Sequence, residues 1–256
     1  MSSNNTPHSH LVIKAGILPF AISPHRHQLA VLLGKIAPAC WVRSKVLHTD
    51  FGGRAQHADA SLFETAAREF LEETLGQVSL PNCTDMSVKG IANFLQGGNY
   101  FAKIMTTRRK KKKQAGDDAC SAVHACVTFL VHIPFNPEIQ KTYSEYRNRL
   151  LSCCRSLRPG GVADRFASKQ PALERVVVSK EENRYRMRKS YTEIEGLNFF
   201  SIEYLSHICQ NKTVQKRISL LHNTRLRFLT LVPILVQCQQ ETLFNHNPGV
   251  QEGEGI

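Results

Sequence analysis

The sequence predicts a mixed α/β fold, built as a single domain of about 200 residues with a C-terminal helical extension. Apolar runs of strand length stand before and after one central helical pattern, and further helical patterns follow in the second half of the chain. The chain has 256 residues, of which 42% are hydrophobic, so it can bury a substantial core. The composition therefore excludes a wholly disordered protein.

Six segments read as strands or strand-like runs. The first two, at 11–23 and 28–36, are apolar and flank the polar turn PHRH. A strand or loop follows over 40–53 and ends in the double glycine Gly52-Gly53. Three later runs are also expected to be strands, at 87–97, 99–107 and 122–135.

The central helix is predicted to begin after Ser61, because Ser61 and Glu64 have the spacing of a capping box. Gly76 is expected just beyond its end. Its buried face is set by residues at helical spacing, namely Phe63, Ala66, Ala67, Phe70, Leu71 and Thr74. A second amphipathic helix follows Pro137, with one face formed by Ile139, Tyr143, Tyr146 and Leu150. The segment 197–208 is expected to be a strand that runs into a helix.

These patterns divide the chain into a folded domain and its appendages. The domain spans 11–206 and contains an exposed basic loop at 107–119 and a helical insertion at 137–171. A flexible N-terminus is expected at 1–10, the helical extension at 207–245 and a disordered tail at 246–256.

Charge and cysteine content indicate the class of partner and the compartment. The formal net charge is +12, from 33 Lys and Arg against 21 Asp and Glu, which favours contact with a polyanion. The eight cysteines show no C-x-x-C spacing and no secretory h-region precedes them, so we expect reduced thiols in an intracellular protein. A cytoplasmic location is expected first, with mitochondrial and nuclear locations as alternatives. The most apolar stretch, 226–238, is too short to span a membrane, so no membrane contact is expected. The oligomeric state is not indicated.

Three glutamates of the central helix point to metal chemistry. Glu69, Glu72 and Glu73 stand at i, i+3 and i+4, where like charges cost roughly 0.2–0.5 kcal/mol per pair. A divalent cation would turn that repulsion into binding, because Mg²⁺ prefers oxygen ligands. The double glycine before the helix lets the backbone approach the same place, where a carbonyl could also serve as a ligand. The arrangement predicts a Mg²⁺ or Mn²⁺ platform for phosphate chemistry.

The segment from Gly52 to Gly76 resembles the Nudix box, G-x5-E-x7-R-E-U-x-E-E-x-G-U, in which U is aliphatic or aromatic. Gly53 matches the first glycine, and REFLEE at 68–73 matches the R-E-U-x-E-E core without a gap. The sequence departs from the box in three ways. Asp59 replaces the first glutamate, one extra residue precedes Arg68, and the final glycine comes one residue late, after Leu75.

The resemblance to the Nudix family implies an α/β/α sandwich whose helix lies over a mixed sheet. It also implies metal-dependent hydrolysis of a nucleoside diphosphate linked to another group. The implied metal ligands are Glu72, Glu73 and the Gly52 carbonyl, with Glu69, oriented by Arg68, as a ligand or the general base. A later acidic residue often joins the site, and Glu193 is the candidate, with Glu195 as the alternative; Glu193 is expected to act both in catalysis and as a ligand.

Substrate class is suggested by two basic runs. The first consists of six consecutive cations, Arg108, Arg109, Lys110, Lys111, Lys112 and Lys113. It could clamp an RNA backbone, or be a solvated or nuclear-import-like loop. The second, Arg184–Lys189, includes Tyr185, which could stack a base.

Three hypotheses follow. The first is a pyrophosphohydrolase acting at an RNA 5′ end. The second is a hydrolase of dinucleoside polyphosphates, nucleotide sugars, dinucleotide cofactors or inositol pyrophosphates. The third is a catalytically silent Nudix subunit of a ribonucleoprotein or regulatory complex.

Overall fold

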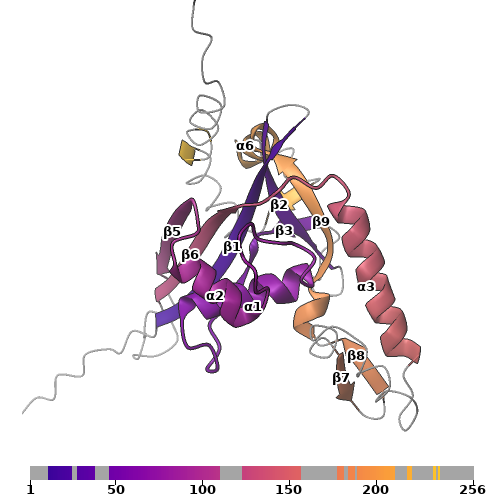
Figure 1. Ribbon diagram of the computed structural model, residues 1–256. Helices are drawn as coiled ribbons and strands as arrows, with labels where there is room; N and C mark the ends of the chain where they lie inside the picture. Colours follow the sequence, from indigo (N-terminus) through magenta and orange to yellow (C-terminus); the bar gives the residue numbers. More distant parts are fainter. Residues whose placement is uncertain are drawn as a thin grey trace, which may run out of the picture.

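The computed structural model describes residues 11–24, 28–37, 46–109, 123–156, 178–181, 184–187, 189–210, 218–220, 233–234 and 236. These residues form a mixed sheet with helices packed on it (Figure 1). Within this part of the chain, no helix is long and apolar enough to cross a membrane.

The sheet is organised around two long strands, β1 (Leu11–Ser23) and β2 (Gln28–Ile36), which pair antiparallel as predicted. β1 also pairs parallel with β6 (Val123–His132), and β6 pairs antiparallel with the outer strand β5 (Ala102–Arg109). The path through the sheet is β10 (Ile218–Leu220), β3 (Val46–Thr49), β2, β1, β6 and β5. Off this path, β4 (Phe51–Arg54) pairs with β1 and β9 (Ile194–Ser201) pairs with β2. Both parallel and antiparallel pairs occur, so the predicted mixed sheet is confirmed.

The segment expected as one strand or loop before the double glycine contains two short strands, β3 (Val46–Thr49) and β4 (Phe51–Arg54). β4 carries the double glycine and lies antiparallel to β1, with Gly16 opposite Gly52. A Cβ on Gly52 would come within 2.7 Å of the Gly16 Cα, so the close approach of these two strands requires glycine. This pairing fixes the double glycine at the edge of the core.

Helix α1 (Leu62–Thr74) covers one face of the sheet, as predicted. Its residues Ala66, Ala67 and Phe70 are fully buried, and Phe70 packs edge-on against Phe51 of β4 at 5.9 Å between ring centroids. The core on this face also takes in Ile17 of β1. Because β4 and β1 both lie under α1, the helix stands directly over the double glycine.

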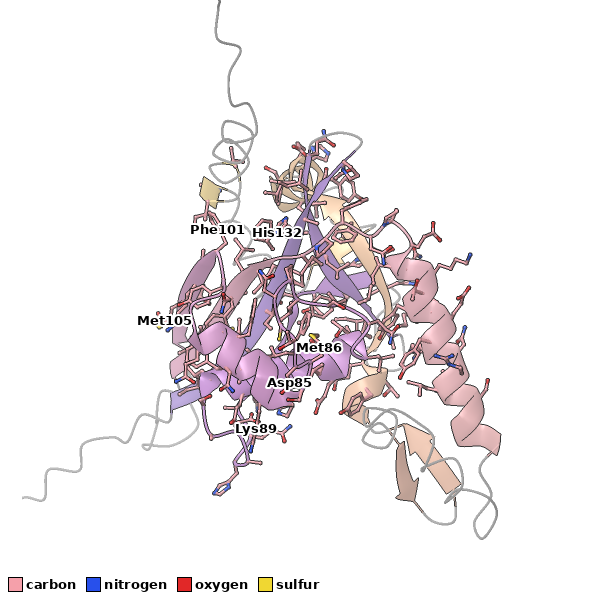
Figure 2. The ribbon with its side chains drawn as sticks, viewed as in Figure 1. Asp85, Met86, Lys89, Phe101, Met105 and His132 are labelled. Atoms are coloured by element: carbon pink, nitrogen blue, oxygen red, sulfur yellow. The ribbon has the colours of Figure 1, made fainter. Side chains whose placement is uncertain are left out.

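The opposite face of the sheet is covered by α6 (Ile202–Gln210), which follows β9 (Ile194–Ser201) as the sequence predicts. Ile202 and Leu205 of α6 belong to a second core with Leu29, Val31 and Leu33 of β2. Helices thus lie on both faces, and the predicted α/β/α sandwich is confirmed. At the end of this core, Phe20 makes edge contacts with Phe101 and His132 (Figure 2).

Helix α3 (Ile139–Ser156) confirms the second predicted amphipathic helix and lies beside β9 (Figure 1). Ile139, Tyr143 and Leu150 are buried on its inner face, and Tyr146 is half-buried. Near its far end lies the hairpin of β7 (Val178–Glu181) and β8 (Arg184–Met187), followed by a short 3₁₀ turn, η2 (Lys189–Thr192). Residues 184–187 of the second basic run are therefore in a strand.

The strand prediction for 87–97 is wrong: this segment forms helix α2 (Val88–Gln96). Ser87 caps it by accepting a hydrogen bond from the Gly90 N–H at 3.1 Å. The carboxylate of Asp85 (Figure 2) in turn accepts a hydrogen bond from the Ser87 N–H. The apolar residues have helical spacing, with Ile91, Ala92 and Leu95 buried. The Ser87 cap and the 3.6-residue period of the apolar residues account for the helix.

Two further boundaries differ from expectation. The strand β5 continues through Arg109, so the basic loop starts later than position 107. In the segment expected to be a helical extension, 218–220 form strand β10, which pairs parallel with β3. The terminal segments 1–10 and 246–256, most of the loop 107–119 and most of 207–245 lie outside the described residues.

Candidate functional site

The first turn of α1 is fixed by the predicted capping box. Ser61 Oγ accepts a hydrogen bond from the Glu64 N–H at 3.1 Å, and Glu64 Oε2 accepts one from the Ala60 N–H at 2.8 Å. The Ser61 bond satisfies an amide that the first turn itself leaves unpaired, and the Glu64 bond ties the helix to Ala60, the residue before the cap. The start of α1 is therefore held firmly, which sets the direction of the acidic residues two turns later.

The end of α1 shows how the late glycine is accommodated. Leu75, at the position where the Nudix box has glycine, adopts a left-handed conformation with φ of 52°, and Gly76 follows with φ of 66°. A leucine in this conformation costs roughly 1–2 kcal/mol, but burying its side chain contributes a similar or larger amount. Leu75 is fully buried. The helix thus ends where the box predicts, with a buried leucine in place of the glycine.

Arg68 binds several groups at the acidic face of α1, the side of the helix that carries Glu69, Glu72 and Glu73. Its Nε and Nη2 donate to the two carboxylate oxygens of Asp59, each at 2.9 Å. Its Nη1 donates to Glu69 Oε1 at 2.8 Å and lies 3.5 Å from Glu72 Oε2, and Nη2 also reaches the Arg54 carbonyl at 3.0 Å. The guanidinium therefore joins the loop before α1 to two of the three glutamates.

Asp59 is a site residue whose role the sequence left undefined. Burial alone would raise the pKa of its carboxyl, but hydrogen bonds from Arg68, the Gln56 amide and Thr65 outweigh burial and lower it. Asp59 therefore stays ionised and fixes Arg68. One feature of the sequence indicated this role: Asp59 stands where the box has its first glutamate. The extra residue before Arg68 disturbs the spacing and so obscured the pairing of Asp59 with Arg68.

Glu73 connects the helix to the double glycine. Its Oε2 accepts a hydrogen bond of 2.8 Å from the Gly52 amide. The side chain is almost entirely buried, and burial, together with the charges of Glu69, Glu193 and Glu72, raises its pKa well above the ordinary value. The structure thus brings Gly52 and Glu73 together through the glycine N–H; the Gly52 carbonyl as a ligand stays a prediction.

Glu69 lies against Gly53. A Cβ on Gly53 would collide with the Glu69 carboxylate, so only glycine leaves room for that side chain. Burial raises the pKa of Glu69, Arg68 opposes the rise, and the negative charges of Glu193 and Asp59 add to it. Glu69 therefore lies at Gly53, and Glu73 at the neighbouring Gly52.

The two candidates from the later loop have different surroundings. The charge of Glu193, just before β9, acts on both Glu69 and Glu73, which places it at the acidic face of α1. Glu195, two residues on, is paired with Lys35 Nζ of β2 at 2.6 Å. The Glu195 carboxylate is therefore engaged by β2, whereas the charge of Glu193 acts on the acidic residues of α1. The surroundings favour Glu193.

The donor set at this face suits a hard divalent cation. The charges of Glu69, Glu72 and Glu193 all act on Glu73, and Arg68 pairs with Asp59 as well as with Glu69 and Glu72. Such a set of oxygens fits Mg²⁺ or Mn²⁺. Among the described residues, no three acidic, histidine or cysteine side chains already converge as a coordination shell. Glu69 is turned to Arg68 and Glu73 to the Gly52 amide, so metal binding would require them to reorient.

Two of the six predicted RNA-contacting residues are among those that the structure describes. Arg108 and Arg109 form the end of β5, opposite His124 and Val123 of β6. The four lysines 110–113 lie outside the described residues.

Comparisons with known proteins give matches among solved structures. No protein-family model matches the sequence, and no curated protein matches it. A Nudix hydrolase from Alicyclobacillus acidocaldarius is 12% identical, with 90% of this chain and 93% of that chain covered and a TM-score of 0.40. An Ap4A hydrolase from C. elegans, in a binary complex, is 11% identical, with coverage of 86% and 95% and a TM-score of 0.35.

The Nudix domain of NrtR from Shewanella oneidensis, in complex with ADP ribose, is 16% identical. The match covers 53% of this chain and 68% of the NrtR chain, with a TM-score of 0.30. Two of these three structures are Nudix proteins, the family whose box the segment 52–76 resembles. At identities of 11–16% and TM-scores of 0.30–0.40, these matches carry no argument about function, which must rest on the site itself.

Proposed function

We propose that the protein is a metal-dependent Nudix pyrophosphohydrolase that cleaves a nucleoside diphosphate linked to another group. The observation that carries this proposal is the buried Glu73 carboxylate, held by the Gly52 amide and surrounded by the charges of Glu69, Glu72 and Glu193. These four carboxylates would hold Mg²⁺ or Mn²⁺, with the Gly52 carbonyl as a further donor. When bound, the ion neutralises charge on the pyrophosphate and lowers the pKa of a water molecule.

Glu69 is the proposed general base. It would accept the proton of the attacking water while the water oxygen bonds to phosphorus and the phosphoric anhydride bond breaks. Burial raises the pKa of Glu69, which makes the carboxylate a stronger base, and Arg68 Nη1 fixes its Oε1 at 2.8 Å. Arg68 is in turn fixed by Asp59, so the orientation of the base depends on the loop before α1.

The finer proposal concerns the substrate. We propose RNA with a 5′ di- or triphosphate, because the net charge is +12 and six consecutive cations stand at 108–113. Cations neutralise phosphates along a strand and release counterions, which favours binding of a polyanion over a small nucleotide. Small-molecule pyrophosphates and a catalytically silent fold are the alternatives that the same assay distinguishes.

The experiment is a substrate panel with the full chain. Dinucleoside polyphosphates, nucleotide sugars, dinucleotide cofactors, inositol pyrophosphates and 5′-triphosphate RNA are incubated with Mg²⁺ or Mn²⁺, and substrate loss is measured. The proposal expects turnover that chelation abolishes and that Glu73→Gln removes. Turnover of RNA in preference to the small molecules supports the finer proposal, and the reverse preference contradicts it. No turnover of any substrate contradicts the enzyme and favours the silent fold.

A further inference from the structure

The insertion helix α3 contacts the backbone at two places that belong to the candidate site. The Tyr143 hydroxyl lies 3.1 Å from the Ile194 carbonyl and 3.2 Å from the Glu73 carbonyl. Arg147, one turn further along α3, donates from Nε to the same Ile194 carbonyl at 3.1 Å. Residues four apart share one face of a helix, so both side chains reach the site from the same side.

These contacts satisfy acceptors that would otherwise be costly. The Glu73 carbonyl is in the last turn of α1, where carbonyls lack partners within the helix. A tyrosine hydroxyl has one proton for two acceptors. Since Arg147 also serves Ile194, Tyr143 can donate to Glu73 and leave neither carbonyl unpaired. Tyr143 is fully buried, so its ring and hydroxyl are held in one position.

The same contacts fix the residue next to Ile194. The Glu193 carbonyl accepts a hydrogen bond from the Ala37 N–H at 2.8 Å, at the end of β2. With the Ile194 carbonyl held from α3, the backbone is anchored at Glu193 and at its neighbour, which limits where the exposed Glu193 side chain can reach. Tyr143 thereby joins the backbone of Glu73 to the backbone beside Glu193.

We propose that Tyr143 and Arg147 are positioning residues, which set the Glu193 carboxylate against Glu73 and so complete the site for a divalent cation. The inference rests on the proposed function and gives the insertion a purpose beyond packing. Neither side chain need touch substrate or metal. Loss of a residue that orients a ligand from behind usually weakens metal affinity by about 10–100-fold.

The test measures Mn²⁺ affinity of the full chain, without substrate, by electron paramagnetic resonance of the unbound ion. Tyr143→Phe and Arg147→Met each should raise the dissociation constant about 10-fold. Matched controls are Arg149→Met, an exposed arginine of α3 whose guanidinium lies over the Tyr146 ring, and Tyr204→Phe on α6. Both controls should bind Mn²⁺ as the wild type does. Melting curves without metal identify a temperature at which every variant is folded. Because Arg147 is only half-buried, Arg147→Met should fold even if Tyr143→Phe does not.

The discriminating step repeats both substitutions in a Glu193→Gln background. If they act through Glu193, they should have little further effect there, because residues that act as a unit are not additive. Equal weakening in both backgrounds, or no weakening in the wild type, overturns the inference. If Glu73→Gln and Glu193→Gln themselves leave Mn²⁺ affinity unchanged, the proposed metal site fails instead. The two failures are thus distinct.

Discussion

The Gly52 amide donates a hydrogen bond of 2.8 Å to Glu73 Oε2, so the double glycine and the last turn of α1 meet at one buried carboxylate. A buried carboxylate near other carboxylates binds its proton tightly, and here the charges of Glu69, Glu193 and Glu72 add to the effect of burial. The arrangement costs stability in the absence of a cation. It is therefore explained better by a function than by folding.

Glu73→Gln tests this relationship most directly. A glutamine oxygen can still accept from the Gly52 amide, so the free energy of unfolding without metal should stay within about 1 kcal/mol of wild type or rise. Hydrolysis should fall by about 100-fold or more, since metal-assisted charge stabilisation is worth several kcal/mol. The stabilisation given by millimolar Mn²⁺ in a thermal melt should also be lost. Full turnover, or a much lower melting temperature without metal, would contradict the site.

The two glycines should differ sharply when each is replaced by alanine. A Cβ on Gly52 meets backbone atoms of β1, the Gly16 Cα at 2.7 Å and the Ala15 carbonyl oxygen at 2.8 Å. Gly52→Ala should therefore destabilise the fold by about 1–3 kcal/mol. A Cβ on Gly53 meets the movable Glu69 carboxylate, so Gly53→Ala should keep the fold and lose activity. Urea denaturation and turnover of the best substrate, measured on both variants, check the contrast; equal loss of stability would refute it.

The sequence predicted α1 and its acidic face because both depend on local features. The capping box of Ser61 and Glu64 and the apolar period of the helix lie within a few turns of each other. α2 was missed because a glycine within a short apolar run made the period of Ile91 and Leu95 ambiguous. The periodicity of nine residues is too short a pattern to distinguish a helix from a strand.

The rest of the site depends on contacts between distant segments. Asp59 binds Arg68 from a loop whose length differs from the box by one residue, so alignment could not define the pair. Tyr143 reaches a carbonyl 51 residues away and another 70 residues away. Nothing in the local pattern of α3 indicates these partners. Only the way β9 returns beside α3 brings them together.

Glu193 and Glu195 give a matched pair in the same strand end. Glu193→Gln should lower the rate constant for turnover more than Glu195→Gln, because the charge of Glu193 acts on Glu69 and Glu73. Glu195→Gln should mainly cost the ion pair with Lys35, a partly exposed contact worth about 1 kcal/mol or less. Steady-state kinetics and melting curves separate the two effects. Equal or reversed losses of turnover would show that the assignment of Glu193 as the later carboxylate is wrong.

His48 should make stability depend on mildly acidic pH. It is buried in β3 beside the Phe200 ring, and burial and then the charge of Lys35 lower its pKa from 6.5 to about 4. Between these values the unfolded chain binds a proton that the folded chain does not. Stability contributed by neutral His48 is therefore present above pH 6.5 and is lost as the pH falls to about 4, by up to about 3 kcal/mol.

His48→Leu should remove this part of the pH dependence, and His57→Leu, at an exposed position, should not. Urea denaturation at pH 7 and pH 4.5 measures both variants against the wild type. Glu69 and Glu73, whose pKa values are raised, act in the opposite direction, so the comparison between variants is what isolates His48. The same acid sensitivity in His48→Leu and wild type would show that another group is responsible.

The basic run at 108–113 can be tested through the salt dependence of RNA binding. Affinity for single strands falls with salt with a slope of about −0.7 per phosphate neutralised, so each lost contact flattens the slope by that amount. Because Arg108 and Arg109 belong to β5, a variant with only Lys110–Lys113 changed to Ser leaves the sheet intact. A second variant changes all six residues. Both should bind 5′-triphosphate RNA with a flatter slope and a higher KM, and both should turn over a dinucleotide substrate normally.

The control for net charge removes four cations elsewhere, Lys89, Lys103, Lys141 and Arg149, all of which are exposed. If the run at 108–113 grips RNA, this control should keep most of the salt slope, although it lowers the overall charge by the same amount as the four-lysine variant. A slower turnover of RNA and dinucleotide alike would instead indicate damage to the metal site. If the slope and KM for RNA do not change when all six residues are Ser, the run is a solvated segment. The small-molecule pyrophosphates would then be the better substrates to pursue.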